Sequence, residues 1–413
     1  MVRRSLLTLT ILSFVISVTA QNNSRHAYAI TSGQKGQFNW SEVKLIDLAT
    51  GSEVKSVYTA NQQPQLLNAR TGQAITASGE KSATNMPFST FSAACAYDKK
   101  HNRLYYTPMG INQLRYIDLN AKSPRIYYFE GEAFGTSASL QDEANHITRM
   151  VIAADGNGYA LSNDGNHLVR FTTGKKPVIT DLGNLVDDQS NKDVSIHNRC
   201  SSWGGDMVAD AFGKLHLISA RHAVFEIDVN SRVSTFKGYI TGLPANYTTN
   251  GAVVDSEGKL IVSSANSVQG YFEVDLQSLK ASKIESKSQV YNTSDLANGY
   301  LALQKEADQK ASAVSAASIL QRSIVRNDNI SIYPNPVTDG TFRLYLDNQR
   351  HGKYEVQLVD LTGRIVNTRV ISIGAKAQVE EMIVSNKLSK GMYLVKVVDG
   401  SRKALFADKL LVQ

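Results

Sequence analysis

Two stretches of the chain, Met150-Val-Ile-Ala-Ala-Asp155 and Asn250-Gly-Ala-Val-Val-Asp255, open the same pattern. Each is a short apolar segment that ends in Asp and is followed by a second apolar segment, at residues 158–161 and 258–262. An Asp at the first position of a turn accepts hydrogen bonds from the turn amides, and a Gly that follows tolerates the backbone angle there. Both stretches therefore predict a β-hairpin with a tight turn.

The same pattern occurs around Asp98 and Asp210, so the hairpin appears four times, about 45–57 residues apart. Each hairpin is followed by a third segment that alternates apolar and polar residues, which is typical of a half-buried strand. These third segments are residues 113–118, 168–172, 223–228 and 270–275. A weaker fourth segment follows the first three of them. A four-stranded unit that repeats at this length indicates the blades of a β-propeller.

The two ends of the repeat region complement each other. Residues 27–31 and 42–47 resemble the second and third strands of a blade that lacks its first strand, and residues 295–302 resemble an isolated innermost strand. Joining them gives about five blades within residues 21–303. Residues 59–91 are interpreted as a long polar insertion, and the alternative is that they contain a sixth blade. A pair of open β-sandwiches is the alternative fold.

Composition restricts the class of protein. The chain has 413 residues, of which 42% are hydrophobic and 20% charged, and its net charge is +7. These values exclude a disordered chain, a collagen and a multi-span membrane protein. No run of Lys and Arg suggests a nucleic-acid surface. With two cysteines, the chain has neither a disulfide framework nor a thiolate zinc cluster.

The first 20 residues predict an export signal. Arg3 and Arg4 precede an apolar run, and the small-x-small pattern at 18–20 predicts cleavage between Ala20 and Gln21. The run is too short to cross a bilayer comfortably. Export would place Cys95 and Cys200 where disulfides form, and we treat a bridge between them as an open possibility.

A propeller presents ligands to the mouth of its central channel, where the innermost strands begin. The sequence places five candidate binding residues at this mouth: Arg149, Trp203, Asp206, Asn250 and Asp295. Such a polar ring suits a glycan, a protein or a peptide, and a Ca²⁺ ion is a further option. The alternative is a hydrated channel that binds no ligand.

Enzyme signatures are largely missing from the sequence. The eight histidines form no H-E-x-x-H pair, and neither a G-x-S-x-G elbow nor a phosphate-binding loop occurs. We therefore predict no catalytic residues, no metal ligands and no required cofactor, and favour a binding protein. The alternative is a secreted hydrolase or lyase that uses the carboxylates of Asp206 and Asp295, with Ca²⁺ as a possible cofactor.

Residues 304–328 predict a linker, because they contain no Gly, Pro or aromatic residue and are rich in Ala, Ser and Gln. Either a short helix or a mobile tether fits this composition. Residues 329–413 then alternate apolar and polar residues between Gly-containing turns, which predicts a small β-sandwich.

Four motifs in this last region occur in a characteristic order. They are Tyr333-Pro-Asn-Pro336, Asp360-Leu-x-Gly-Arg364, Leu388-x-x-Gly-x-Tyr-x-Val395 and the terminal Lys409-Leu-x-Val412. The region resembles the type A C-terminal sorting domain of the type IX secretion system. The residues that carry this resemblance are Pro334, Asn335, Pro336, Asp360, Gly363, Arg364, Gly391, Tyr393, Lys409 and Val412.

The resemblance implies a route and a set of partners. A Gram-negative bacterium would export the chain through the Sec translocon to the periplasm, and the type IX machinery would carry it across the outer membrane. The sorting domain would then be cleaved, and the cargo would be released or attached to surface lipopolysaccharide. The expected location is therefore secreted or at the cell surface. The ligand, an unidentified protein or glycan, is not a nucleic acid.

Overall fold

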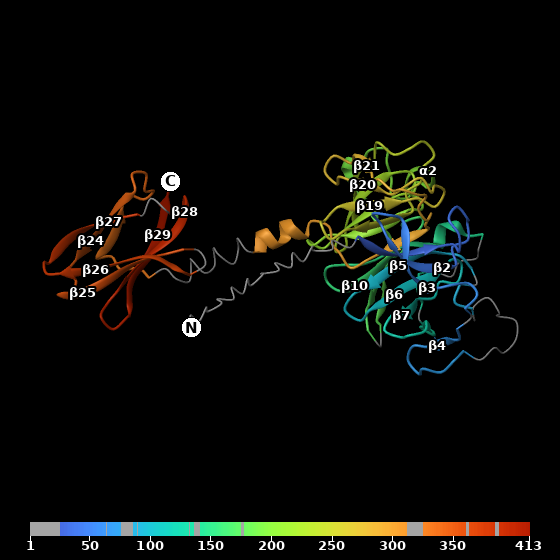
Figure 1. Ribbon diagram of the computed structural model, residues 1–413, viewed down its shortest axis with the longest axis horizontal. Helices are drawn as coiled ribbons and strands as arrows, with labels where there is room; N and C mark the ends of the chain where they lie inside the picture. The colour runs from blue at the N-terminus through green and yellow to red at the C-terminus, as the bar shows by residue number, and fades with distance from the viewer. Residues whose placement is uncertain are drawn as a thin grey trace, which may run out of the picture. The chain divides into compact units, whose positions relative to one another are not determined.

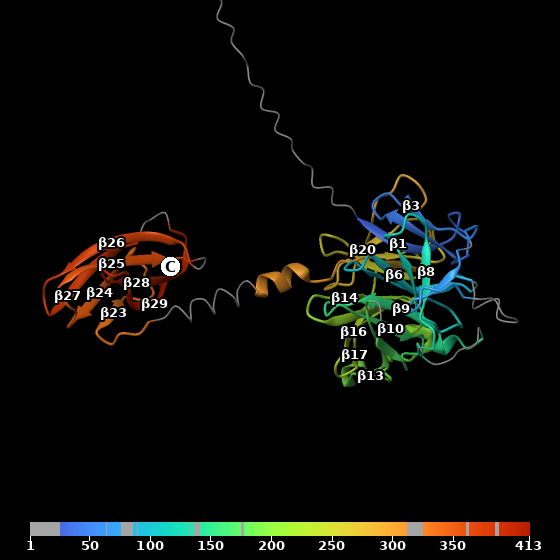
Figure 2. The same cartoon turned by 90° about the horizontal axis from the view of Figure 1, so that it is seen from below.

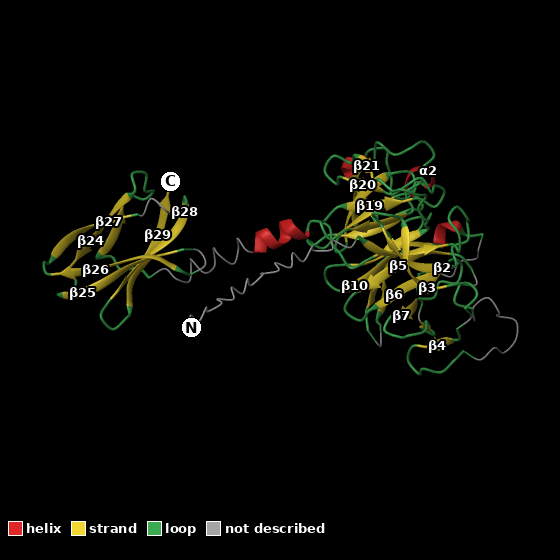
Figure 3. Ribbon diagram, viewed as in Figure 1, coloured by secondary structure: helices red, strands yellow, loops and turns green. Residues whose placement is uncertain are grey.

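The structure is a computed structural model. It describes residues 25–62, 64–75, 86–88, 90–131, 133–135, 141–174, 177–311, 325–360, 363–384 and 388–413. The predicted export signal at 1–20, its cleavage site at Ala20 and Gln21, and most of the predicted linker lie outside these residues. The chain divides into two compact units, Met1–Gln304 and Lys305–Gln413. Strands are the main regular element of both units (Figure 3).

The first unit is built from five mainly antiparallel sheets arranged around a common axis (Figure 1). In order from the axis outward, the first sheet contains β22 (Asp295–Ala297), β1 (His26–Thr31), β2 (Glu42–Asp47) and β3 (Ser52–Tyr58). The second contains β5 (Ser92–Asp98), β6 (Arg103–Pro108), β7 (Arg115–Asp118), β8 (Arg125–Tyr128) and β4 (Leu66–Asn68). The third contains β9 (Ile147–Ile152), β10 (Asn157–Ser162), β11 (Leu168–Thr172) and β12 (Ile179–Asp181).

The remaining two sheets follow the same plan. The fourth contains β14 (Asp206–Ala209), β15 (Lys214–Ile218), β16 (Ala223–Asp228), β17 (Val233–Tyr239) and β13 (Val186–Asp187). The fifth contains β18 (Gly251–Val254), β19 (Leu260–Ser263), β20 (Phe272–Val274) and β21 (Ala281–Lys283). The innermost strands contact one another in the cyclic order β22, β5, β9, β14, β18 and back to β22. The predicted five-bladed propeller is therefore confirmed.

The predicted closure between the chain ends is also confirmed. Strand β22 pairs with β1 so that Tyr28 lies opposite Ala297 and Ile30 opposite Asp295. One blade is thus made from both ends of the propeller sequence. Of the long insertion, residues 66–68 add a parallel strand, β4, to the outer edge of the second blade. The described residues contain neither a sixth blade nor the alternative pair of sandwiches.

The hydrophobic core is divided among the five interfaces between neighbouring blades. Each interface holds one cluster of buried apolar side chains. Adjacent residues of one strand contribute to different clusters: Leu104 and Tyr106 pack toward the first blade, whereas Tyr105 packs toward the third. This follows from the period of two in a strand. Because both faces of a blade are buried, the inner strands read as almost continuous apolar runs.

Helices are few and short in the described residues. They are η1 (Glu143–Asn145), η2 (Gln189–Asn191), α2 (Arg199–Ser202) and a helix over residues 304–311, which falls in the predicted linker. None of the helices that can be described has the length and apolarity needed to cross a bilayer.

The second unit is a β-sandwich, as predicted (Figure 2). One sheet contains β23 (Ile330–Tyr333), β24 (Thr341–Asp347) and β27 (Ala377–Ile383). The other contains β26 (Ile365–Ile373), β25 (Gly352–Val359), β28 (Gly391–Val398) and β29 (Ala404–Val412). Buried side chains from both sheets, such as Leu344 and Val395, form its core.

The closing strand β22 provides a test of the ring. Leu296 is 2% exposed and packs between the first and fifth blades. We expect Leu296→Ala to lower the free energy of unfolding of the propeller by about 2–4 kcal/mol, because it leaves a cavity in a closed core. Chemical denaturation measures this change. Val54→Ala, on the outer strand of the same blade, should change stability by less than about 0.5 kcal/mol. Equal effects would contradict the assigned closure.

Candidate functional site

The two ends of the propeller axis differ in chemistry. We name the end at which the five innermost strands begin the start face, and the end at which they finish the end face. The five predicted binding residues belong to the start face or to the strands just inside it. Their burial decides whether a ligand in solution could reach them.

Asp206 and Asp295 meet at the axis but are 1% and 0% exposed. The Asp206 carboxyl accepts hydrogen bonds from the backbone amides of Met207 at 2.6 Å and Ala252 at 2.7 Å. The Asp295 Oδ1 atom accepts a hydrogen bond from the Cys95 thiol at 3.0 Å. The two carboxyl groups are close enough to influence each other electrostatically. The sequence thus predicted this pair of residues at the axis, but they lie inside the protein.

Burial raises the pKa of both carboxyl groups well above the ordinary value, and the nearby charge of Asp206 raises that of Asp295 further. Asp295 Oδ2 has no donor among the described residues. Two facing carboxyl oxygens repel each other unless one carries a proton. Burial and the neighbouring carboxyl therefore favour the protonated form of Asp295. Burial and the neighbouring Asp295 also raise the pKa of Cys95, which remains a thiol.

Arg149 does not line an open mouth. Its side chain is fully buried and donates to the carbonyl oxygens of Ser162 at 2.9 Å, Ser202 at 2.6 Å and Gly204 at 3.0 Å. Burial lowers its pKa. Backbone carbonyl oxygens accept the hydrogen bonds of the guanidinium, so Arg149 connects the third blade to the loop that leads into β14. This corrects its prediction as a contact residue.

Hydroxyl groups fill the rest of the start face. Ser294 donates to Ser92 O at 2.8 Å, and Thr31 donates to Asn292 O at 2.7 Å. Thr249 donates to Ser219 O. All three hydroxyl residues are buried. Internal hydrogen bonds therefore close this end of the channel.

Trp203 and Asn250 are half-buried and are also engaged within the protein. The Trp203 indole donates to His197 O at 3.2 Å, and the Arg199 guanidinium lies 5.2 Å from the centre of its ring. The Asn250 Oδ1 atom accepts from the Thr248 hydroxyl at 2.6 Å. The five predicted residues do not form one open site.

The two cysteines, for which the sequence left a bridge open, are not bonded to each other. Cys95 and Cys200 are both free thiols. Cys95 is buried on β5, where its thiol donates to Asp295, whereas Cys200 is exposed on the short helix α2. Cys200 does lie shortly before the innermost strand β14, but there it is exposed on α2, whereas Cys95 is buried within the ring.

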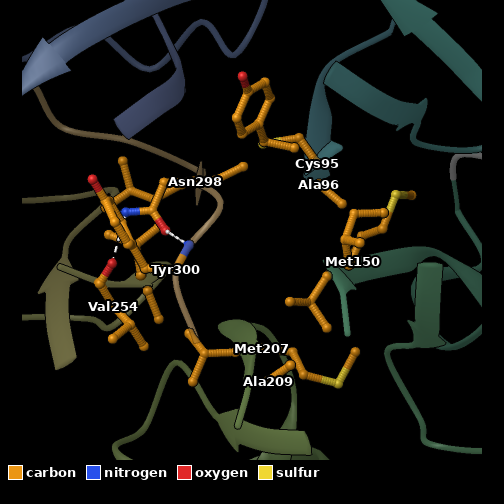
Figure 4. Close-up of a pocket in the computed structure, with 16 residues that line it drawn as sticks. Cys95, Ala96, Met150, Met207, Ala209, Val254, Asn298 and Tyr300 are labelled. Atoms are coloured by element: carbon orange, nitrogen blue, oxygen red, sulfur yellow. Dashed lines mark hydrogen bonds between the residues drawn. The ribbon is translucent and has the colours of Figure 1, made fainter. Parts of the chain in front are cut away.

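Below the carboxyl pair, the axis is narrow and apolar. A cavity of about 20 Å³ is lined by side chains such as Ala96, Met150 and Met207 from three inner strands (Figure 4). This volume is room for about one water molecule. The channel therefore cannot hold a ligand.

The end face contains a larger hollow of about 190 Å³ between the first and second blades. We name it the end-face hollow. It is lined by His26, Tyr28, Leu45, Tyr97, Lys99, Asn298, Gly299 and Tyr300. The sequence analysis missed it, because its residues come from three distant parts of the chain. Only the aromatic and amide residues directly after the closing strand could have suggested it.

Aromatic rings and hydrogen bonds fix the shape of this hollow. The rings of Tyr28 and Tyr97 lie 4.9 Å apart, and the Tyr97 hydroxyl donates to Asn102 Oδ1 at 3.0 Å. Asn298 donates to Val254 O at 2.8 Å and accepts from the Tyr300 amide at 3.3 Å (Figure 4). The hollow is thus preformed rather than assembled by a ligand.

The repeated aspartates cap turns, as predicted. The Oδ1 atoms of Asp98, Asp155, Asp210 and Asp255 accept backbone amide hydrogen bonds from the residues that follow them. Within the described parts of the chain, no group of three or more His, Cys, Asp or Glu side chains is placed to hold a metal ion.

The sorting motifs hold the second unit together. The Asn335 amide donates to Lys409 O at 2.7 Å, and its Oδ1 atom accepts from Leu411 N at 2.9 Å. Val337 pairs with Val412 beside it. The Asn335 side chain therefore forms with the last strand the pair of hydrogen bonds that the backbone of a neighbouring strand would form. This attaches the first motif to the last residues of the chain.

The other two motifs stabilise turns. Asp360 accepts from the backbone amide of Arg364 at 3.0 Å and from its guanidinium at 3.1 Å, and Gly363 occupies the left-handed position between them with φ +85°. The Tyr393 hydroxyl donates to Ser389 O at 2.7 Å, just before Gly391 begins β28. Leu361 lies outside the described residues.

The family comparison identifies this unit. Residues 331–413 match the secretion system C-terminal sorting domain. The second unit is therefore a secretion system C-terminal sorting domain, in agreement with the resemblance carried by the four motifs. No curated protein matches the chain significantly.

Solved structures resemble the chain only distantly. PorZ of Porphyromonas gingivalis, a surface component of the type IX secretion system, is 15% identical with a TM-score of 0.31, covering 94% of this chain. The chain spans 51% of PorZ. A structure of a nidogen/laminin complex is 10% identical with a TM-score of 0.33 over 66% of this chain and 97% of that one. Streptogramin B lyase is 9% identical with a TM-score of 0.28 over 78% and 83%. Such low scores carry no argument about function.

The buried carboxyl pair predicts an unusual pH dependence. The folded pKa values lie above those of the unfolded chain, so the folded state binds more protons, and stability falls as pH rises above about 4. An amide at position 295 needs no proton and can donate to Asp206. We expect Asp295→Asn to raise the free energy of unfolding by roughly 1–3 kcal/mol at pH 8, with a smaller gain toward pH 4.

Denaturation at several pH values measures this effect. Asp193→Asn, at an exposed position, is the matched control and should leave the pH profile unchanged. A profile of Asp295→Asn parallel to that of the wild type would contradict the raised pKa of this carboxyl group.

The two hydrogen bonds between the Asn335 side chain and the last strand give a second prediction. We expect Asn335→Ala to destabilise the sorting domain by about 1–2 kcal/mol, because two hydrogen bonds to the last strand are lost. The propeller should unfold as before, which calorimetry can check. Asn335→Asp keeps the acceptor for Leu411 but sets a carboxylate against Lys409 O, so it should not restore stability. Full stability of either variant would contradict the stabilising role of these two hydrogen bonds.

Proposed function

We propose that this chain is a secreted or surface-displayed binding protein whose propeller is the delivered part and whose C-terminal domain directs its passage across the outer membrane. The single observation that carries the export step is the sorting domain at residues 331–413, with its motifs folded into one sandwich. A Sec-type signal at residues 1–20 supplies the first step, to the periplasm. Release into the medium and attachment to surface lipopolysaccharide are the two outcomes of the second.

Binding is favoured over catalysis by the burial of Asp206 and Asp295, the carboxyl pair that the described residues place at the axis. The alternative hydrolase or lyase would require Asp206 and Asp295 to meet a substrate, but both are at most 1% exposed behind a layer of internal hydrogen bonds. The end-face hollow, by contrast, opens to solvent and has aromatic walls with few polar groups. Such walls are typical of ligand sites.

The export step predicts where the protein accumulates. In a Gram-negative host that has a type IX system, we expect deletion of residues 329–413 to move the protein from the surface and the medium to the periplasm. The reason is that the deleted chain keeps its first export signal and loses the second. Fractionation and immunoblotting measure the distribution, and mass spectrometry of the mature form determines both termini.

A matched control separates sorting from misfolding. The deleted chain should retain the cooperative unfolding of the propeller, because no propeller strand comes from residues 329–413. A folded, deleted chain that still reached the medium or the surface in normal amounts would refute the proposed role of the domain.

A further inference from the structure

The end-face hollow differs from the rest of the axis in being accessible. The start face is closed by internal hydrogen bonds, and the axial cavity is about 20 Å³. The end-face hollow is about 190 Å³, and Tyr300 at its rim is 39% exposed. A ligand that approached the propeller along its axis would therefore find room only at the end face.

Tyrosine rings form the walls of the hollow. Tyr28 comes from the first blade, Tyr97 from the second, and Tyr300 from the segment that follows the closing strand. Burial raises the pKa of Tyr28 to about 12, so its hydroxyl stays protonated. Aromatic rings present a negative face, which attracts polarised C–H groups. The walls therefore suit a ring with C–H groups on its faces and hydroxyl groups on its rim.

The charge of the hollow is positive and uncompensated. Lys99 lines it, and its Nζ atom lies 5.8 Å from the centre of the Tyr300 ring. No Asp or Glu lines the hollow, and among the described residues Lys99 has no ion pair. The adjacent Asp98 carboxylate is occupied by His101 at 2.6 Å. An anionic group would thus meet an ammonium that no carboxylate among the described residues already pairs with.

The size of the hollow limits the ligand to one small ring. Its volume is below the ~300–1,000 Å³ of pockets for drug-sized ligands. Gly299 helps to set this size, because a Cβ atom there would lie 3.1 Å from Cβ and 3.2 Å from Cδ of Lys99. The missing side chain lets the Lys99 stem lie along the wall.

We propose that the end-face hollow binds an acidic monosaccharide unit of the uronic-acid type. Its ring packs against the tyrosines, its carboxylate pairs with Lys99, and the imidazole of His26, which has no partner among the described residues, meets a hydroxyl. The assignment rests on the proposed binding function and names its site and ligand class. A peptide carboxylate would satisfy Lys99 but leave the aromatic walls uncovered.

Calorimetric titration of the purified full chain tests the proposal. The probes are methyl glucuronide, its neutral counterpart methyl glucoside, and N-acetyl-aspartate as a peptide-like acid. We expect saturable binding of methyl glucuronide, and at least about tenfold weaker binding of the other two, because only the first has both the ring and the charge.

Variants locate the site. Lys99→Met keeps the apolar stem and removes the charge, so it should weaken methyl glucuronide binding about tenfold and leave methyl glucoside unchanged. Tyr300→Ala should weaken both sugars. The control is Lys122→Met, since Lys122 is exposed in the same blade but does not line the hollow.

Three results would overturn the proposal. They are no saturable binding of methyl glucuronide, tighter binding of N-acetyl-aspartate than of the sugar, and unchanged binding by Lys99→Met. The export experiment is independent of these titrations, so a failed sugar site would leave the sorting function standing. A different ligand, bound with equal affinity by wild type and Lys99→Met, would keep the binding function and remove only this site.

Discussion

Closure of the ring is the constraint on which the propeller depends. Each blade buries both faces against its neighbours, so a blade without a neighbour would expose a full apolar face. The pairing of β22 with β1 brings the first and last parts of the propeller sequence into one sheet and completes the fifth interface. The core is continuous only because this one non-local pairing exists, and residues from all five inner strands then share one narrow axis.

The narrow axis explains the polar chemistry at its start. The five inner strands converge at the axis, where the side chains of Asp206, Asp295 and Cys95 are buried together. Polar groups at such a place need partners from the protein, and here backbone amides and a thiol donate to the two carboxyl groups. The same convergence leaves almost no free volume below them. Ligand access is thereby confined to the periphery of the opposite face.

Sequence reasoning found the blades because their turn aspartates and alternating strands repeat at a visible interval. It found Asp206 and Asp295 at the axis for the same reason. It could not show that they are buried, because a residue at the start of an inner strand faces either solvent or a neighbouring strand, and only the number and tilt of the strands decides. The end-face hollow escaped because His26, Tyr97 and Tyr300 are close in space through the ring closure alone. The sequence placed Arg149 among the binding residues because its true partners are backbone carbonyl oxygens. Every residue has a carbonyl oxygen, so such partners cannot be recognised from the sequence.

The shared blade has a consequence for the topology of the ring. The side-chain Nδ2 atom of Asn298, just after the closing strand, donates to the backbone carbonyl oxygen of His26 at 3.5 Å, so the two segments of chain lie side by side at the beginning of β1. A short peptide connection there would make the backbone circular, and opening it at a surface loop between two other blades would leave all five sheets intact. The fold therefore does not depend on which blade contains the ends of the polypeptide. Circular permutants of this domain should fold to the same ring.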